Sequence, residues 1–295
     1  MSTPPPDQFD RWPNAAAADD APPPVAEFVV PGIRADAARG VAWVGEGWAL
    51  FKQVPLTWIL IMLILFGINM VVGFIPLIGG MLGYLIRPLL TVGVLAFARE
   101  LDHGRDAELN QLFIGFQTKD KMWPLVGVGG LYLVTLMVIV VIAVIIIGVM
   151  VIAGGGAQAL ASAAAATTEQ QTLQAVMDLM THNNLGLWIM LVILIMVALM
   201  MLASMIFWFV PGLVFYANVS LMDAVWESFA ALCRNWLSLL VYSVVVLVVA
   251  LVACIPLGLG LFVAIPVLMA SNYACFRDIF GRRPDEFGMT VPQQS

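Results

Sequence analysis

The hydrophobic residues of this chain lie in long runs without charge, separated by shorter segments that hold nearly all the charged side chains. Three of the runs, residues 124–168, 186–222 and 235–276, contain no Asp, Glu, Lys or Arg. Each is longer than the ~20 apolar residues that cross the hydrocarbon core of a bilayer as a helix. The pattern therefore predicts an integral membrane protein.

Six membrane-spanning helices are predicted from these runs. Lipid offers no hydrogen-bond partner to a bare backbone, and the runs lack the two-residue alternation of a barrel strand, so helices fit the pattern. The predicted spans are about residues 56–75, 78–98, 124–153, 187–217, 237–256 and 258–276. The expected fold is an all-α integral membrane domain over residues 39–295.

Residues 1–38 have a different composition, because eight of the 17 prolines lie between Pro4 and Pro31, among Ala and Asp. Such a segment cannot bury enough apolar surface to offset the entropy lost on ordering. Its start carries Asp7 and Asp10 and lacks the apolar core of a signal peptide. We therefore expect a disordered tail that stays on the protein.

Composition supports the membrane prediction, and the positive charges predict an orientation. Hydrophobic residues make up 62% of the chain and charged residues 11%, against about 25% charged residues in soluble domains. With six spans, twelve of the 13 Lys and Arg residues fall on the side that holds both termini, and none falls on the opposite side. Cytoplasmic segments are rich in Lys and Arg, so the bacterial inner membrane with both termini in the cytoplasm is expected.

Arg87 is the remaining cation, and it falls near the middle of the second predicted span. An Arg there costs about 2.5–3.5 kcal/mol on insertion scales, and no predicted span holds an Asp or Glu. Asn69, Tyr84 and Asn272, carbonyls near Pro88, or the anion of a lipid or substrate are its candidate partners. The alternatives are a structural role for Arg87 and contact with an anionic headgroup or carboxylate.

Amphipathic segments flank the predicted spans. In residues 220–236, Ser220 and Asp223 form a start similar to a capping box. Apolar residues then recur at three- and four-residue spacing, and the predicted apolar face comprises Leu221, Val225, Phe229, Leu232 and Trp236. This interfacial helix, which also holds Trp226 and Arg234, is expected to lie along the inner membrane surface or to pack beneath the bundle.

A similar helix is expected over residues 40–52, before the first span, with its aromatic side chains at the level of the lipid headgroups. Another short interfacial helix is expected over residues 167–181, on the outer side. The two amphipathic segments that precede hairpins lie about 180 residues apart. They suggest a parallel internal repeat, although any two hydrophobic hairpins look alike.

Groups that could carry catalysis or hold a metal are few. His103 and His182 are predicted on opposite sides of the membrane, so they cannot share a metal or a catalytic triad. The carboxylates of residues 100–108 are interpreted as a solvated face with Arg99 and Arg105. The sequence also lacks the basic patch of a nucleic-acid-binding protein. We expect no catalytic residue, metal, cofactor or nucleic-acid partner.

Short motifs lie in both halves of the chain. In the first half they are Arg39-Gly40, Trp43, Gly47-Trp48-x-Leu50-Phe51, Pro55, Trp58, Pro76-x-x-Gly79, Pro88, Gly93 and Leu112-Phe113-x-Gly115-Phe116. In the second half they are Trp208-Phe209-x-Pro211, Ser220, Ala224, Ser228-Phe229 and Arg234-Asn235-Trp236. Over about residues 34–280 the chain resembles an uncharacterised family of bacterial polytopic inner-membrane proteins. That family is similar in pattern to YciC-like proteins and to membrane domains fused to glycerophosphodiester phosphodiesterases. The resemblance implies location and topology and supplies no catalytic residue.

The expected function is a non-enzymatic, membrane-organising or accessory role, in which the helices bind lipids or partner membrane proteins. The alternative is a transporter of a small anionic or amphipathic molecule, which needs polar groups that converge on one cavity. The polar residues of the spans are Asn69, Arg87, Thr91, Thr135, Ser204, Ser243, Ser271 and Asn272. If they make separate helix contacts instead, a structural role is favoured.

Overall fold

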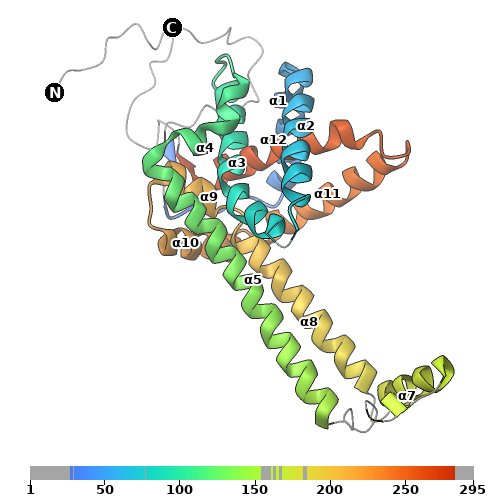
Figure 1. Cartoon of the computed structure of the whole chain (residues 1–295). Coiled ribbons are helices and arrows are strands. Elements are labelled where there is room, and N and C mark those ends of the chain that lie inside the picture. Colours follow the sequence, from blue (N-terminus) through green and yellow to red (C-terminus); the bar gives the residue numbers. More distant parts are fainter. Residues whose placement is uncertain are drawn as a thin grey trace, which may run out of the picture. The chain divides into compact units, whose positions relative to one another are not determined.

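The computed structural model describes residues 27, 28, 30–76, 78–153, 161, 164, 165, 168–181 and 185–282. The described chain is helical apart from one pair of short strands (Figure 1). It forms two compact units. Unit 1 holds the residues up to Gly129 and those from Trp208 onward, and unit 2 is Gly130–Phe207. The all-helical class predicted from the sequence is confirmed.

Unit 1 contains most of the helices. Its first half comprises β1 (Glu27–Phe28), α1 (Arg39–Gln53), α2 (Pro55–Gly73), α3 (Gly79–Asp102), the 3-10 helix η3 (Leu109–Phe113), α4 (Ile114–Gln117) and the start of α5 (Lys119–Ala153). Its second half comprises α9 (Val210–Gly212), the π-helical η5 (Leu213–Ala217), α10 (Leu221–Arg234), α11 (Trp236–Cys254), α12 (Leu261–Phe280) and β2 (Gly281–Arg282). Unit 2 holds the rest of α5, α7 (Glu169–Thr181) and α8 (Leu185–Ile206).

Five helices of the described chain are long and apolar enough to cross a membrane. They are Pro55–Gly73, Gly79–Asp102, Lys119–Ala153, Leu185–Ala217 and Trp236–Cys254, and they correspond to the first five predicted spans. The sixth predicted span, residues 258–276, is helical as α12 but is not among these five. Its helix continues to Phe280 and carries Arg277 and Asp278 in its last turns.

Helix α1 packs closely against α11 and α12. A Cβ atom placed on Gly47 would lie 2.6 Å from both the Ser271 nitrogen and the Val267 oxygen of α12. Trp43 and Phe51 are buried, whereas Trp48 is exposed, so two of the three rings pack within the protein, and their level relative to the lipid headgroups stays a prediction. The glycine lets the two backbones approach more closely than any larger residue would.

The contact between α3 and the η3–α4 segment explains two of the sequence motifs. A Cβ atom on Gly93 of α3 would overlap the backbone of Leu112 in η3. In return, a Cβ atom on Gly115 of α4 would lie 2.7 Å from the Leu89 oxygen of α3. Gly93 and the Leu112-Phe113-x-Gly115-Phe116 motif therefore belong to one packing contact.

Part of the N-terminal segment packs against α12 and β2 of unit 1. Strand β1 pairs with β2 in antiparallel register, with Phe28 opposite Gly281. The buried Phe28 ring lies 4.9 Å from the ring centroid of Phe276, and the Ile33 N–H donates to the Ile279 oxygen over 2.7 Å. These contacts involve the end of the segment that was predicted to be disordered, and the disorder of the rest of that segment stays a prediction. Residues 1–26 lie outside the described chain.

The three segments that were predicted as interfacial helices are all helical, as α1, α10 and α7. Ser220 caps α10 by accepting a hydrogen bond from the Asp223 N–H over 3.3 Å. The predicted apolar face of α10 is not the side that is buried in the protein. Small residues form the buried side, namely Ala224, Ser228 and Ala231, whereas Phe229 is exposed. The parallel repeat stays a prediction, and its two leading helices differ in surroundings, since α1 packs mainly on α11 and α12 and α10 contacts α9, η5 and α11.

We predict that Gly47→Ala lowers the free energy of unfolding by about 1–3 kcal/mol, because the new methyl group overpacks the α1–α12 contact. Gly45→Ala is the matched control, since a Cβ atom there meets no other atom within 4 Å. The measurement is unfolding of the detergent-solubilised protein followed by tryptophan fluorescence. Equal stability of the two variants would contradict the close helix contact.

Candidate functional site

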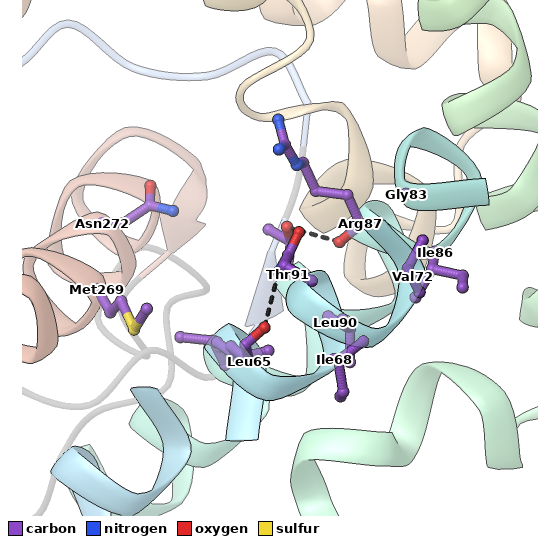
Figure 2. Close-up of a pocket in the computed structure, with 12 residues that line it drawn as sticks. Leu65, Ile68, Val72, Gly83, Ile86, Arg87, Leu90, Thr91, Met269 and Asn272 are labelled. Carbon is purple, nitrogen blue, oxygen red and sulfur yellow. Dashed lines mark hydrogen bonds between the residues drawn. The ribbon is translucent and has the colours of Figure 1, made fainter. Parts of the chain in front are cut away.

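A cavity of about 240 Å³ lies between α2, α3 and α12 in unit 1. Figure 2 shows its walls, with Met269 and Asn272 on α12 facing the side chains of α2 and α3. Much of the lining is apolar, namely Leu65, Ile68, Val72, Ile86, Leu90, Val94 and Met269. The polar lining residues are Asn69, Arg87, Thr91 and Asn272. The cavity thus combines an apolar surface with a few polar groups.

Arg87 is the charged residue of this lining, and its side chain is exposed. Its guanidinium carbon lies 5.7 Å from the ring centroid of Tyr84, one turn earlier on α3, which is a cation–π distance. The ion pairs within the described part of the chain join other cations, and none includes Arg87. The N–H groups of Arg87 therefore have no carboxylate partner among the described residues.

Asn69 and Asn272 each form a hydrogen bond through one of the two polar atoms of the side-chain amide. Asn69 Nδ2 donates to the Leu65 oxygen over 2.7 Å, and Asn272 Oδ1 accepts from Trp208 Nε1. Within the described chain Asn272 Nδ2 donates no hydrogen bond, and it remains a donor at the cavity wall. Arg87 and Asn272 thus both present N–H groups, a pairing that suits an anion.

All four sequence candidates for anion contact meet in this region. Asn69, Arg87 and Asn272 line the cavity itself, and Tyr84 lines an adjacent hollow of about 220 Å³ together with Asn69 and Arg87. Three helices bring them together, since the four residues span more than two thirds of the chain. Their contact with an anion stays a prediction.

The other polar residues of the predicted spans make helix contacts. Thr135, Ser204 and Ser243 each donate to a carbonyl one turn earlier on the same helix over 2.8 Å. Ser271 donates to the Leu268 oxygen and lies 2.8 Å from the Tyr242 hydroxyl. Of the eight polar residues in the predicted spans, four therefore converge on one cavity, as a transporter requires. The other four make hydrogen bonds within or between helices.

Arg277 on α12 is the centre of an ion-pair network that the sequence analysis missed. Its guanidinium donates to Glu46 Oε2 over 2.7 Å and to Asp102 Oδ1 over 2.5 Å, and its side chain is 6% exposed. The Tyr273 hydroxyl donates to the other oxygen of Asp102 over 2.9 Å. Asp102, which was interpreted as part of a solvated face, instead joins α3 to α12.

Arg39 extends the network from α1. It donates to Asp278 Oδ2 and to Glu46 Oε1, both over 2.6 Å, and Trp43 Nε1 donates to Asp278 over 2.9 Å. Burial raises the pKa of Glu46 above its usual value, although Arg277 and Arg39 act to lower it. Burial lowers the pKa of Arg39, but the hydrogen bond and charge of Asp278 outweigh this, so the pKa is raised.

The remaining sequence candidates have structural contacts or lie outside the description. Arg234 donates to the Gly32 oxygen, and the Trp226 and Phe229 rings lie 6.0 Å apart on α10. His103 Nδ1 lies 2.6 Å from the Arg99 oxygen, and His182 is outside the described residues. Among the residues that the structure describes, no group of three His, Cys, Asp or Glu side chains could hold a metal ion.

Sequence comparison relates the chain to a membrane protein. It is 26% identical over 250 residues to a protein of Burkholderia thailandensis named as a probable inner membrane protein, covering 82% of this chain and 83% of that protein. No family model and no solved structure matches the chain. Together with the five candidate spans, the similarity identifies a multi-pass membrane protein.

Arg277→Met is predicted to lower the free energy of unfolding by about 3–5 kcal/mol, because it leaves the Glu46 and Asp102 carboxylates without their shared cation. The control is Arg105→Met, since Arg105 is 56% exposed in its pair with Glu100 and such pairs contribute about 0–1 kcal/mol. Equilibrium unfolding in detergent measures the free energy of unfolding of both variants. A small effect for Arg277→Met would show that the network is dispensable.

Proposed function

We propose that this chain is a non-enzymatic accessory protein of the bacterial inner membrane that binds an anionic lipid at the Arg87 cavity. One observation carries the proposal: Arg87 of α3 and Asn272 of α12, which both carry N–H donors, line one cavity, and none of its lining residues in the described chain is a carboxylate. A phosphate oxygen of a headgroup would accept from both donors, and guanidinium groups bind phosphates through paired hydrogen bonds.

The position of Arg87 favours a lipid over a water-soluble anion. Arg87 lies on a candidate membrane span and its side chain is exposed. A cation at such a position is costly unless a partner compensates its charge. The apolar lining from Leu65, Val72 and Ile86 would lie against the acyl chains of the same lipid. One amphipathic ligand thus matches both the polar and the apolar residues that line the cavity.

A six-span topology with both termini in the cytoplasm is part of this proposal. Asn235, at the start of α11, donates to the Ile33 oxygen, and the Ile33 N–H donates to Ile279 near the end of α12. The residue that caps the start of α11 and the last turn of α12 therefore lie together, so if α11 crosses the membrane, α12 crosses back. The Lys and Arg distribution then favours a cytoplasmic location for this end.

Transport of a small anionic or amphipathic molecule is the second candidate function. The convergence of Asn69, Arg87, Thr91 and Asn272 on one cavity favours it. Among the described residues, we find no comparably specific site for partner membrane proteins, whose binding is the other form of an accessory role. Transport predicts a flux of the anion across a vesicle membrane, and lipid binding alone does not. The variants Arg87→Gln and Arg105→Gln therefore separate the two functions.

Arg87→Gln is predicted to reduce retention of anionic lipid about tenfold or more, since hydrogen bonds to a charged group contribute roughly 1.5–3 kcal/mol. Native mass spectrometry of the gently extracted protein measures the bound lipid. Arg105→Gln, which removes a cation near the end of α3 and outside the cavity, should retain it.

Unchanged lipid retention by Arg87→Gln would refute the lipid-binding proposal. If vesicles reconstituted with the wild-type protein conduct a small anion and Arg87→Gln abolishes this flux, transport replaces lipid binding as the proposed function.

Reporter fusions test the topology. A reporter fused after Leu173 or after Leu257 is expected on the outer side of the membrane, and one fused after Gly281 in the cytoplasm. Alkaline phosphatase, which is active outside, and a fluorescent protein, which folds inside, give opposite readouts. A cytoplasmic result after Leu173 or an outer result after Gly281 would overturn the six-span topology.

A further inference from the structure

Helix α10 presents an uncharged stripe of large side chains away from the protein. Met222, Trp226 and Phe229 are 62%, 67% and 37% exposed. Their spacing of four and three residues places them on one face of the helix. We define these three residues as the α10 stripe. The next position of the same row, Cys233, and the first residue of α11, Trp236, are also exposed.

The stripe cannot turn inward, because the opposite face of α10 is already packed. Ala224, Ser228 and Ala231 are buried there, and small side chains let α10 approach its neighbours. At the end of the helix, Asn235 donates to the Ala231 oxygen and to the Ile33 oxygen, both over 3.0 Å. The rotation of α10 about its own axis is therefore set by the protein.

A third, polar face separates the stripe from one edge of the packed face. Asp223, Glu227, Ala230 and Arg234 follow at helical spacing. A helix that has an apolar face, a polar face and a fixed orientation on its protein is suited to lie in the plane of a membrane interface.

The connections of α10 place it at the membrane surface. Residues 218–220 join it to the candidate span that ends at Ala217, and Asn235 joins it to the candidate span that begins at Trp236. Both ends of α10 thus lie where a span leaves the lipid; Trp is enriched at that level, and Trp and Phe are typical of the apolar face of interfacial helices. We infer that the α10 stripe is immersed in the interface between lipid headgroups and acyl chains.

The charges of α10 indicate which force binds the stripe to the membrane. The helix carries Asp223 and Glu227 against one cation, Arg234, and that cation bonds to the Gly32 oxygen. An amphipathic helix without free basic residues gains nothing from anionic lipid and inserts through apolar burial. Docking of the stripe therefore does not depend on lipid charge, and it is independent of the Arg87 cavity.

Spin labels on two faces of α10 test this inference. The background is the full chain in lipid nanodiscs with Cys233→Ala and Cys254→Ala, which leaves Cys275 buried and unlabelled. Trp226→Cys and Met222→Cys report on the stripe, and Ala230→Cys on the polar face is the matched control. Power saturation compares collisions of each label with oxygen, which is concentrated in lipid, and with a water-soluble nickel chelate.

The ratio of oxygen to nickel accessibility is expected to be several-fold higher at residues 222 and 226 than at residue 230, equally in zwitterionic and anionic nanodiscs. A ratio at the stripe no higher than at residue 230 would mean that the stripe is not immersed in lipid, and it would overturn the inference. Exclusion of both reagents would mean that protein covers the stripe, and immersion confined to anionic lipid would mean electrostatic binding. Either result would also overturn it.

Discussion

The burial of Arg277 between Glu46 and Asp102 is the interaction on which unit 1 depends. One guanidinium joins α1, α3 and α12, and Arg39 extends the pairing to Asp278. Each carboxylate alone would be costly to bury, and each is compensated by a cation from another helix. The close approach of α1 to α12 at Gly47 brings these charges within reach. Packing and electrostatics therefore require one another here.

The same network sets the rotation of α12, and with it the cavity. The Tyr273 and Arg277 side chains, one turn apart, bind Asp102 of α3. Met269 and Asn272, on the adjacent part of the helix surface, face the cavity between α2 and α3 (Figure 2). A change in the rotation of α12 would carry Asn272 away from Arg87. The ion pairs thus position the donors of the proposed binding site without touching its ligand.

Arg87 and Arg277 differ in what surrounds their charge. Arg277 is nearly inaccessible and has two carboxylate partners, so its charge is compensated within the protein. Arg87 is exposed on a candidate span, beside the Tyr84 ring and an apolar cavity. A cation in that setting gains most from an anion that comes with its own apolar chains. This difference is why lipid binding is proposed at one arginine and a structural role is assigned to the other.

The membrane helices can be predicted from the sequence alone, because the cost of placing charge in lipid acts on each segment locally. The sequence also singled out Arg87, Asn69 and Asn272, since polar residues in apolar runs are conspicuous. Two features required the three-dimensional structure: Glu46 pairs with Arg277, 231 residues away, and the small residues of α10 are buried while Trp226 is exposed. Periodicity shows that a helix has two faces, but the neighbour that packs most closely selects which one is buried.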